Sequence, residues 1–313
     1  QTDKPWHLQP GTVIRFERGA GVRYTGPKHN GYAFHFGRNC RIFGGQFFAG
    51  KASRGIGIGW RTTWEGGEAN CIGTGYALQC MGEHGSVKNC IIKGGSRSCT
   101  SVRRAYNQFD NVTCSEFDHH AFSCGGYAQH TSYNQCRAIG KGQPGKPVQG
   151  SGWRMGGGIV SITDCESINT GRGIKTGVST SERAFPVRLL VDGFRCRGTN
   201  KASVVIVGRG STNFRNAELD GQIWAYGSTS NTFENVSIED SRFAIRVGRA
   251  TRSCHLYDSI LNAPVAIGSK HRETDADVRL RRCQIAGKLK EANSPVQLDV
   301  DEATQNSAAN ING

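Results

Sequence analysis

The amino-acid sequence predicts an all-β solenoid, and three observations support that fold class. Glycine is abundant, with 43 residues against only 8 prolines in a chain of 313. A motif of about twenty residues recurs along the chain, and its copies contain alternating apolar positions but no convincing helix. Such a unit cannot bury its own apolar face, whereas stacked copies bury it against one another.

The first part of the motif places a small apolar residue, often cysteine, after Asn or Asp. Because a residue that recurs once per coil points the same way each time, we expect these thiols to stack in the interior as free, small hydrophobes. Twelve cysteines would otherwise suggest a disulfide framework, and the lack of a C-x-x-C pair argues against zinc. Seven cysteines define the series: Cys40, Cys71, Cys90, Cys114, Cys136, Cys165 and Cys196.

The second part of the motif alternates two or three apolar positions and closes on glycine, as in Gly173–Gly177 and Ala244–Gly248. Alternation with a period of two predicts short strands, and Gly, Asn and Asp supply the turns between them. One Asn or Asp per repeat lies between the two parts: Asp118, Asn169, Asn200, Asp220, Asp240 and Asn262.

This pattern of turn residues and small interior residues, over roughly residues 31–290, resembles the pectate-lyase-like parallel β-helix superfamily. In that superfamily asparagines stack at one turn, and the Asn/Asp series is similar to such a ladder. The resemblance implies a single right-handed parallel β-helix of about ten coils. It would occupy residues 1–313 as one domain, with a polar tail at 291–313.

The charge of the chain favours a polyanionic partner. The sequence has 39 Lys and Arg against 25 Asp and Glu, which gives a net charge of +14, and such an excess attracts polyanions. The bases are scattered and match no nucleic-acid-binding motif. No apolar stretch is long enough for a transmembrane helix. We therefore expect an acidic polysaccharide as partner, with neither nucleic acid nor membrane, and a secreted protein or a virion tail as the setting.

Alignment of the repeats on their closing glycines predicts two outward columns of side chains, concentrated between residues 54 and 175. They would line a groove parallel to the solenoid axis, although any single arginine could equally be a solvated surface residue. The first column is Arg54, Tyr76, Arg97, His120 and Arg172, and the second is Gln79, Thr100, Ser123, Arg154 and Lys175.

These residue types fit the β-elimination of a uronate polymer. A cation neutralises the carboxylate, a base removes the neighbouring C–H proton, and an acid protonates the leaving oxygen. We assign neutralisation to Arg97 or Arg154 and proton abstraction to His120. Lys175, whose pKa would be depressed by surrounding positive charge, is the alternative base. The acid would be Tyr76 or Tyr127.

Further residues are predicted to contact the substrate: Arg54, Arg172, His119, Tyr127, Trp60 and Trp153. The tryptophans could instead fill the core. His119 and His120 would face opposite ways on a strand, unless the turn continues through them. With Asp118 they resemble the Asp-Pro-His motif of mannuronate epimerases, without its proline. Segment 140–152, with Lys141 and Lys146, reads as a protruding loop that could form a wall of the cleft.

The sequence therefore predicts a polysaccharide lyase, and two alternatives remain open. One is a phage tailspike domain that binds or hydrolyses a bacterial capsule, and the other is a polyuronate C5-epimerase. The protein would be a monomer or a homotrimer. We favour a site without cofactor or metal, because the calcium-binding Asp clusters of the superfamily are not evident, and calcium stays open as the alternative. The Asn-Thr-Asp and Gly-His-Gly motifs of polygalacturonases are absent as well.

Overall fold

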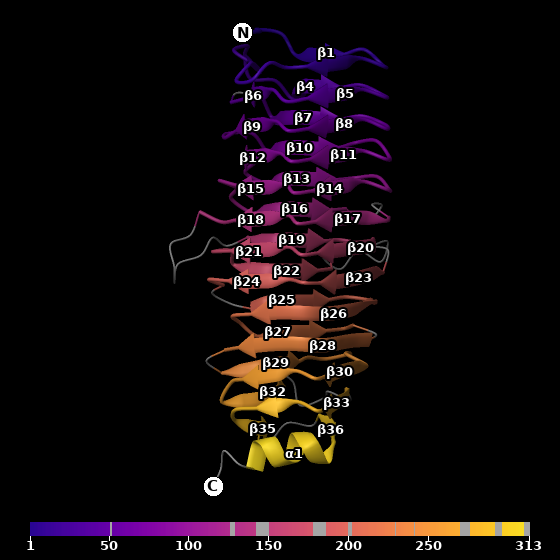
Figure 1. Ribbon diagram of the computed structural model, residues 1–313, viewed down its shortest axis with the longest axis vertical. Coiled ribbons are helices and arrows are strands. Elements are labelled where there is room, and N and C mark those ends of the chain that lie inside the picture. Colours follow the sequence, from indigo (N-terminus) through magenta and orange to yellow (C-terminus); the bar gives the residue numbers. More distant parts are fainter. Residues whose placement is uncertain are drawn as a thin grey trace.

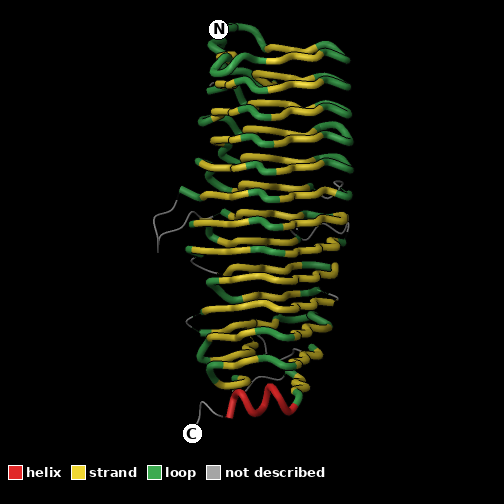
Figure 2. The backbone as a smooth tube through the Cα atoms, in the orientation of Figure 1, coloured by secondary structure: helices red, strands yellow, loops and turns green. Residues whose placement is uncertain are grey.

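The chain winds into one elongated stack of coils with its two ends at opposite ends of the stack (Figure 1). This computed structural model describes residues 1–50, 52–125, 129–141, 150–177, 186–199, 202–228, 230–240, 242–269, 276–291 and 296–309. Each coil contributes strands that lie above those of the coil before, as Figure 2 shows. Within the described residues, no helix has the length and apolarity needed to cross a membrane.

One side of the stack is a sheet of 13 strands, in which each strand pairs in parallel with the corresponding strand of the next coil. This sheet carries most of the candidate functional residues. Its strands in spatial order are β1 (Trp6–Leu8), β4 (Tyr32–Phe36), β7 (Arg54–Ile58), β10 (Tyr76–Cys80), β13 (Ser98–Val102), β16 (His120–Cys124), β19 (Ser151–Met155), β22 (Arg172–Thr176), β25 (Ala202–Val207), β27 (Ile223–Tyr226), β29 (Phe243–Val247), β32 (Val265–Ser269) and β35 (Lys288–Lys290).

The remaining 23 strands form the other sheet, again by parallel pairing between coils. Most coils contribute two strands to it, separated by a sharp turn. They are β2 (Val13–Arg15), β3 (Gly21–Arg23), β5 (Arg41–Phe43), β6 (Gln46–Phe48), β8 (Thr63–Glu65), β9 (Glu68–Cys71), β11 (Ser86–Lys88), β12 (Ile91–Gly94), β14 (Gln108–Asp110), β15 (Thr113–Ser115), β17 (Thr131–Asn134), β18 (Arg137–Ile139), β20 (Gly158–Thr163), β21 (Glu166–Ile168), β23 (Val187–Asp192), β24 (Arg195–Arg197), β26 (Gly210–Leu219), β28 (Ser230–Glu239), β30 (Ser253–Tyr257), β31 (Ile260–Asn262), β33 (Asp277–Arg281), β34 (Gln284–Ile285) and β36 (Gln297–Val300).

The predicted fold class is confirmed: the molecule is a parallel β-solenoid of about 11 turns, close to the ten expected. The stacking extends beyond the range 31–290 expected for the repeats. At the N-terminal end, β1 pairs with β4, and at the C-terminal end β36 pairs with β33. Helix α1 (Glu302–Ala309) follows β36 and lies across the last coil (Figure 1).

The core runs the length of the stack and is filled by the inward residues of every strand. Alternation in the sequence produces it, because successive side chains of a strand face opposite sides of a sheet. Trp153, a predicted substrate contact, is completely buried in it, as is Trp64. The prediction that Trp153 contacts substrate is therefore wrong. Its ring stacks on Phe122 at 4.9 Å and packs edge-on against Phe194.

All twelve cysteines are buried and free, as the sequence predicts. They do not share one stack, however. Cys136 and Cys165 lie directly above one another, with the Cys136 amide donating to the Cys165 sulfur at 3.3 Å. Cys71 instead pairs in register with Gly94, and Cys196 with Ser167. The seven-membered series thus divides among several interior columns, which explains its irregular spacing.

An amide ladder is present, but at another turn than expected. Asn111 donates to the Asn89 side-chain oxygen at 2.9 Å, and Asn235 donates to that of Asn216 at 2.7 Å. All four adopt a left-handed backbone with φ of 50–52°, which Asn tolerates better than most residues. They belong to the turn within the 23-stranded sheet, before the interior position that Cys90 occupies.

The predicted Asn/Asp series does not form that ladder. Asp220 accepts a hydrogen bond from the Thr199 hydroxyl at 2.9 Å, and Asp240 accepts one from the Arg242 amide at 2.8 Å. Asp118 instead forms an ion pair with Lys141 at 2.8 Å. These carboxylates bind turns or surface cations, and Asn200 lies outside the described residues.

Candidate functional site

Two columns of side chains run along the outer face of the 13-stranded sheet, close to the arrangement that the sequence predicts. In the first column Tyr76 pairs in register with Arg54 and Ser98, and the next members follow in order, one per coil. The members of the second column likewise pair in register from each strand to the next. The first column is Arg54, Tyr76, Ser98, His120, Ser151 and Arg172, and the second is Gln79, Ser101, Ser123, Arg154 and Lys175.

Two predicted members of these columns are displaced by one residue. Ser98, not Arg97, occupies the first column, because β13 begins at Ser98 and Arg97 lies in the turn before it. Ser101, not Thr100, occupies the second column, and Thr100 is completely buried. β13 is followed by Arg103, where the next coil has Gly125, so alignment on glycine shifts the register there. A shift of one residue reverses the face of a strand side chain.

The 13 strands of this sheet contain no Asp and no Glu. Their outward cations therefore have no carboxylate beside them on the sheet. Arg154 stands directly beside Lys175, with like charges in adjacent register positions. Neither Arg154, Lys175 nor Arg172 forms an ion pair with any carboxylate in the part of the chain that the structure describes.

A pocket of about 940 Å³ opens on the outer face of strands β10 to β19. We call it the basic pocket. Tyr76 lies at one end and Arg154 at the other, separated by three strand spacings, or about 14 Å. Its polar lining consists of Tyr76, Arg97, Ser98, Ser101, Arg103, Arg104, His119, His120, Ser123 and Arg154.

His120 lies within the basic pocket as a half-buried imidazole. Burial, reinforced by the positive charges of Arg154 and Lys175, lowers the pKa of His120 to about 3. The ring is therefore uncharged in the ligand-free protein at neutral pH. Its Nδ1 atom is buried and has no hydrogen-bond partner among the described residues. His120 is thus a neutral imidazole, held in place without using that nitrogen.

Lys175 lies just beyond the basic pocket, on β22. Burial, with the neighbouring charges of Arg172 and Arg154, lowers the pKa of Lys175 below its ordinary value. The uncharged amine is therefore more populated near neutral pH than in an isolated lysine. A lysine whose pKa is lowered in this way can act as a base.

Unpaired polar atoms line this face. Of the twelve buried side-chain atoms without a partner among the described residues, six lie at outward positions of β10, β16, β19, β22, β27 and β29. Leaving such an atom unpaired costs about 1–3 kcal/mol. A ligand that supplies hydrogen-bonding groups along the axis would remove that cost. The atoms are Gln79 Nε2, His120 Nδ1, Ser151 Oγ, Arg172 Nε, Trp224 Nε1 and Arg246 Nε.

The remaining predicted contact residues divide between this face and other places. His119 lies before β16, in the turn, and both it and His120 line the basic pocket, with ring centroids 6.1 Å apart. Arg54 extends the first column beyond Tyr76 and lies over the Tyr32 ring at 5.3 Å. Arg172 continues the same column beyond the pocket. Tyr127 lies outside the described residues.

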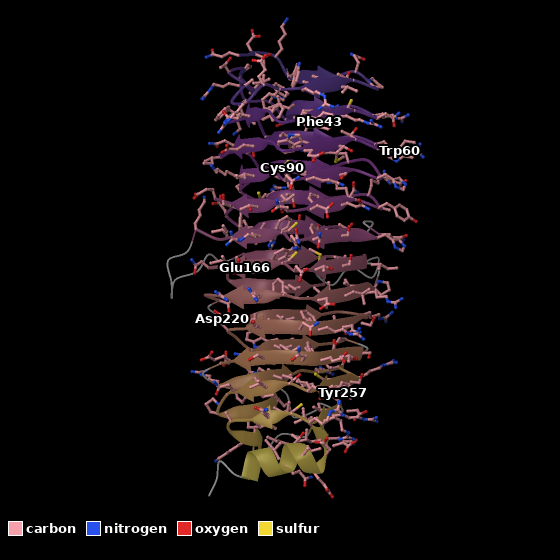
Figure 3. The ribbon with its side chains drawn as sticks, viewed as in Figure 1. Phe43, Trp60, Cys90, Glu166, Asp220 and Tyr257 are labelled. Carbon is pink, nitrogen blue, oxygen red and sulfur yellow. The ribbon has the colours of Figure 1, made fainter. Side chains whose placement is uncertain are left out.

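Trp60 is exposed and does not line the basic pocket, but it lines an adjoining concavity that shares Met81 and Arg104 with that pocket. It is 38% exposed and occupies the turn after β7, at the edge of the stack in Figure 3. Arg61 and Arg38 lie over its ring at 5.0 Å and 5.8 Å. Of the predicted loop, Lys141 forms the ion pair with Asp118 described above, whereas residues 142–149, including Lys146, lie outside the described residues.

Sequence reasoning missed Arg103 and Arg104, which line the basic pocket from the turn after β13. It also missed Ser98 and Ser101, for the register reason given above. The adjacent Arg103-Arg104 pair is visible in the sequence, but it follows the coil that lacks a closing glycine. An alignment on Cys80, Val102 and Cys124, which pair in register, would have found it.

Carboxylates line other surfaces of the molecule. A second concavity contains Asp220, Glu239 and Asp240, where Asp220 accepts from the amide and hydroxyl of Thr199 and Asp240 accepts from the amides of Gln222 and Arg242. Among the described residues, no three His, Cys, Asp or Glu side chains are grouped so that they could hold a metal ion.

Comparison with known proteins supports the fold. The Dettilon tailspike protein superposes with a TM-score of 0.61 and 14% identity, over 86% of this chain and 60% of that chain. A point variant of the catalytic domain of GH87 α-1,3-glucanase in complex with nigerose superposes with a TM-score of 0.52 and 12% identity, over 96% of this chain and 63% of that chain. This chain thus spans less than two thirds of either. No protein-family model matches the sequence. No curated protein matches it either. These similarities support the parallel β-helix fold that the resemblance in the sequence implies.

Proposed function

We propose that the protein is a polysaccharide lyase that cleaves a uronate-containing chain by β-elimination at the basic pocket. The observation that carries the proposal is the pairing of cations with proton-transfer groups on a face without carboxylates. Arg154 and Lys175 stack as like charges there, and such an arrangement is destabilising unless an anion joins it. A row of uronate carboxylates would supply that anion.

The first chemical requirement is neutralisation of the substrate carboxylate. A carboxylate makes the neighbouring C–H a very weak acid, and a cation beside it stabilises the charge that develops when the proton leaves. Arg97 and Arg154 both line the basic pocket. Arg154 is the stronger candidate, because it is half-buried and close enough to His120 to lower its pKa.

The second requirement is a base. His120 is uncharged, but with a pKa of about 3 it is a weak base in the ligand-free state. A bound carboxylate would offset the charges of Arg154 and Lys175, and would therefore raise the pKa of His120 toward its ordinary range. Lys175 is the alternative base, since its pKa is lowered toward neutrality.

The third requirement is an acid for the leaving oxygen. As the base takes the proton, the carbon–oxygen bond to the next sugar breaks and a carbon–carbon double bond forms. The departing oxygen takes the electron pair and needs a proton. Tyr76 lines the pocket two strand spacings from His120, about 10 Å along the axis, and its phenol can donate that proton.

Hydrolysis is less well supported. Glycosidases most often need two carboxylic groups across the scissile bond, about 5–10 Å apart. The described lining of the basic pocket contains none. The test is incubation with polygalacturonate, alginate and hyaluronan, with ultraviolet absorbance of the unsaturated ends and reducing ends recorded together. Both signals rise for a lyase, whereas reducing ends without absorbance would overturn the proposal.

The pH dependence of cleavage identifies the base. If His120 acts, kcat/KM is lost only on acidification toward pH 3, where the imidazole gains a proton. If Lys175 acts, kcat/KM rises with pH through a pKa below the ordinary lysine value of 10.5. A profile that responds to neither residue's substitution would remove both assignments.

A capsule-binding tailspike domain is the second candidate, favoured by the likeness of fold to the Dettilon tailspike protein. This function would use the same cations for binding without elimination. Retained binding of an acidic capsule without either cleavage signal would favour it, as would a trimeric mass in solution. Binding with an altered uronate composition, and no cleavage, would instead indicate a C5-epimerase.

A further inference from the structure

A second cluster of side chains lies on the outer face of the 13-stranded sheet, beyond the basic pocket. We call it the aromatic platform. The second column continues from Lys175 through Val205 and Trp224 to Arg246, in register from coil to coil. The platform consists of Trp224 and Tyr226 on β27, and Phe243 and Arg246 on β29.

The aromatic rings of the platform lie low against the sheet. Tyr226 covers Gly248, and a Cβ atom at that position would collide with its ring. Phe243 covers Gly268 in the same way. Trp224 packs edge-on against Tyr226, with ring centroids 6.2 Å apart. Glycine thus makes room for rings that lie along the surface, an arrangement suited to stacking against the apolar face of a sugar.

The polar atoms of the platform need acceptors. Trp224 Nε1 and Arg246 Nε are buried, and neither has a hydrogen-bond partner among the described residues. Both are donors only, and the sheet contains no carboxylate to receive them. The missing partner is therefore rich in oxygen acceptors, and beside a cation an anionic one is favoured.

We propose that the aromatic platform is a distal subsite that binds the same acidic polysaccharide as the basic pocket; the ligand class rests on the proposed function. From His120 to Arg246 there are five strand spacings, or about 24 Å. A polysaccharide lying parallel to the axis passes over the pocket, Lys175 and then the platform. Short chains cannot reach both.

The test measures binding of galacturonate and alginate oligomers, as trisaccharides and dodecasaccharides, by calorimetry. It uses whichever of the His120→Gln and Lys175→Met proteins has lost cleavage, so that substrate stays intact. Trp224→Ala or Arg246→Gln should weaken dodecasaccharide binding by about tenfold or more and leave trisaccharide binding unchanged. Trp224→Phe keeps an aromatic ring but loses the N–H. Its affinity for the dodecasaccharide should lie between that of the protein with Trp224 and that of Trp224→Ala.

The control is Arg215→Gln, which removes a cation from the 23-stranded sheet, where Arg215 pairs with Glu234 at 3.0 Å. It should alter neither affinity. If the platform variants weaken both oligomer lengths equally, or neither, the distal subsite is overturned and the proposed function stands. If no oligomer binds any of these proteins, both proposals fail. Matching thermal melts show that the variants are folded.

Discussion

The two sheets of the solenoid differ in how their charged side chains are arranged, although the same coils form both. On the 23-stranded sheet one column reads Arg137, Glu166, Arg195 and Glu218, so that opposite charges alternate from coil to coil. Arg137 and Glu166 approach to 3.1 Å, and Arg195 and Glu218 to 3.5 Å. On the 13-stranded sheet, Arg154 stacks on Lys175 with no carboxylate on the sheet.

This difference separates charges that stabilise the stacking of coils from charges that oppose it. Alternating cross-strand pairs are mutually satisfied and favour coil stacking, whereas like charges in adjacent positions oppose it. Proteins retain such unfavourable arrangements mostly where activity needs them. The net charge of +14 alone could not make this distinction, because it counts both sheets together.

The largest expected effect is on catalysis at the 13-stranded sheet. His120→Gln or Lys175→Met, whichever residue is the base, should lower kcat by about 10²–10⁴-fold, because general base catalysis contributes that much. Initial rates of product absorbance measure it. Arg137→Gln is the matched control on the 23-stranded sheet and should keep the full rate. Full activity in both His120→Gln and Lys175→Met would contradict the assignment of the catalytic base to the 13-stranded sheet.

Arg154→Gln should lower kcat/KM by about 10²–10³-fold, the usual effect of removing one electrostatic contact to a developing charge. Its thermal stability should stay equal or rise slightly, because a like-charge contact with Lys175 disappears. Activity assays and thermal melts on one sample give both values. A clear fall in stability would mean that Arg154 is structural, like the arginines of the other sheet.

Acidification should destabilise the protein through His120. Its pKa is about 3 when folded, against an ordinary value of 6.5, so the unfolded chain takes up the proton first as the pH falls. The free energy of unfolding is therefore at its full value above about pH 6.5 and falls as the pH decreases from 6.5 to 3. The loss is about 3 kcal/mol at pH 4. Urea unfolding at pH 4 and pH 7 should show a smaller pH effect in His120→Gln, and an identical effect would contradict this.

The smallest effect belongs to the exposed ion pairs. Glu166→Gln should cost less than about 1 kcal/mol, because solvent and salt screen such a pair. The loss should shrink further at high salt in a denaturant titration, with cleavage unchanged. A loss of activity in this variant would mean that the 23-stranded sheet also contributes to cleavage, which would contradict the difference between the two sheets.

The sequence by itself determined the repeat, the all-β class and the buried free cysteines. These follow from local patterning: alternation produces strands, glycine and asparagine permit turns, and a unit of this size must stack to bury its apolar face. It also placed Tyr76, His120, Arg154 and Lys175 on one outer face, since equal spacing from a closing glycine gives equal position in successive coils.

Only the tertiary structure decided the register where the repeat is irregular. β13 is followed by Arg103 instead of a glycine, so alignment on glycine expected Arg97 where the pairing of the strands places Ser98. It also decided that Trp153 fills the core and that the amide ladder belongs to the Asn89 turn. The pairing of cations depends likewise on which residues of distant coils become neighbours.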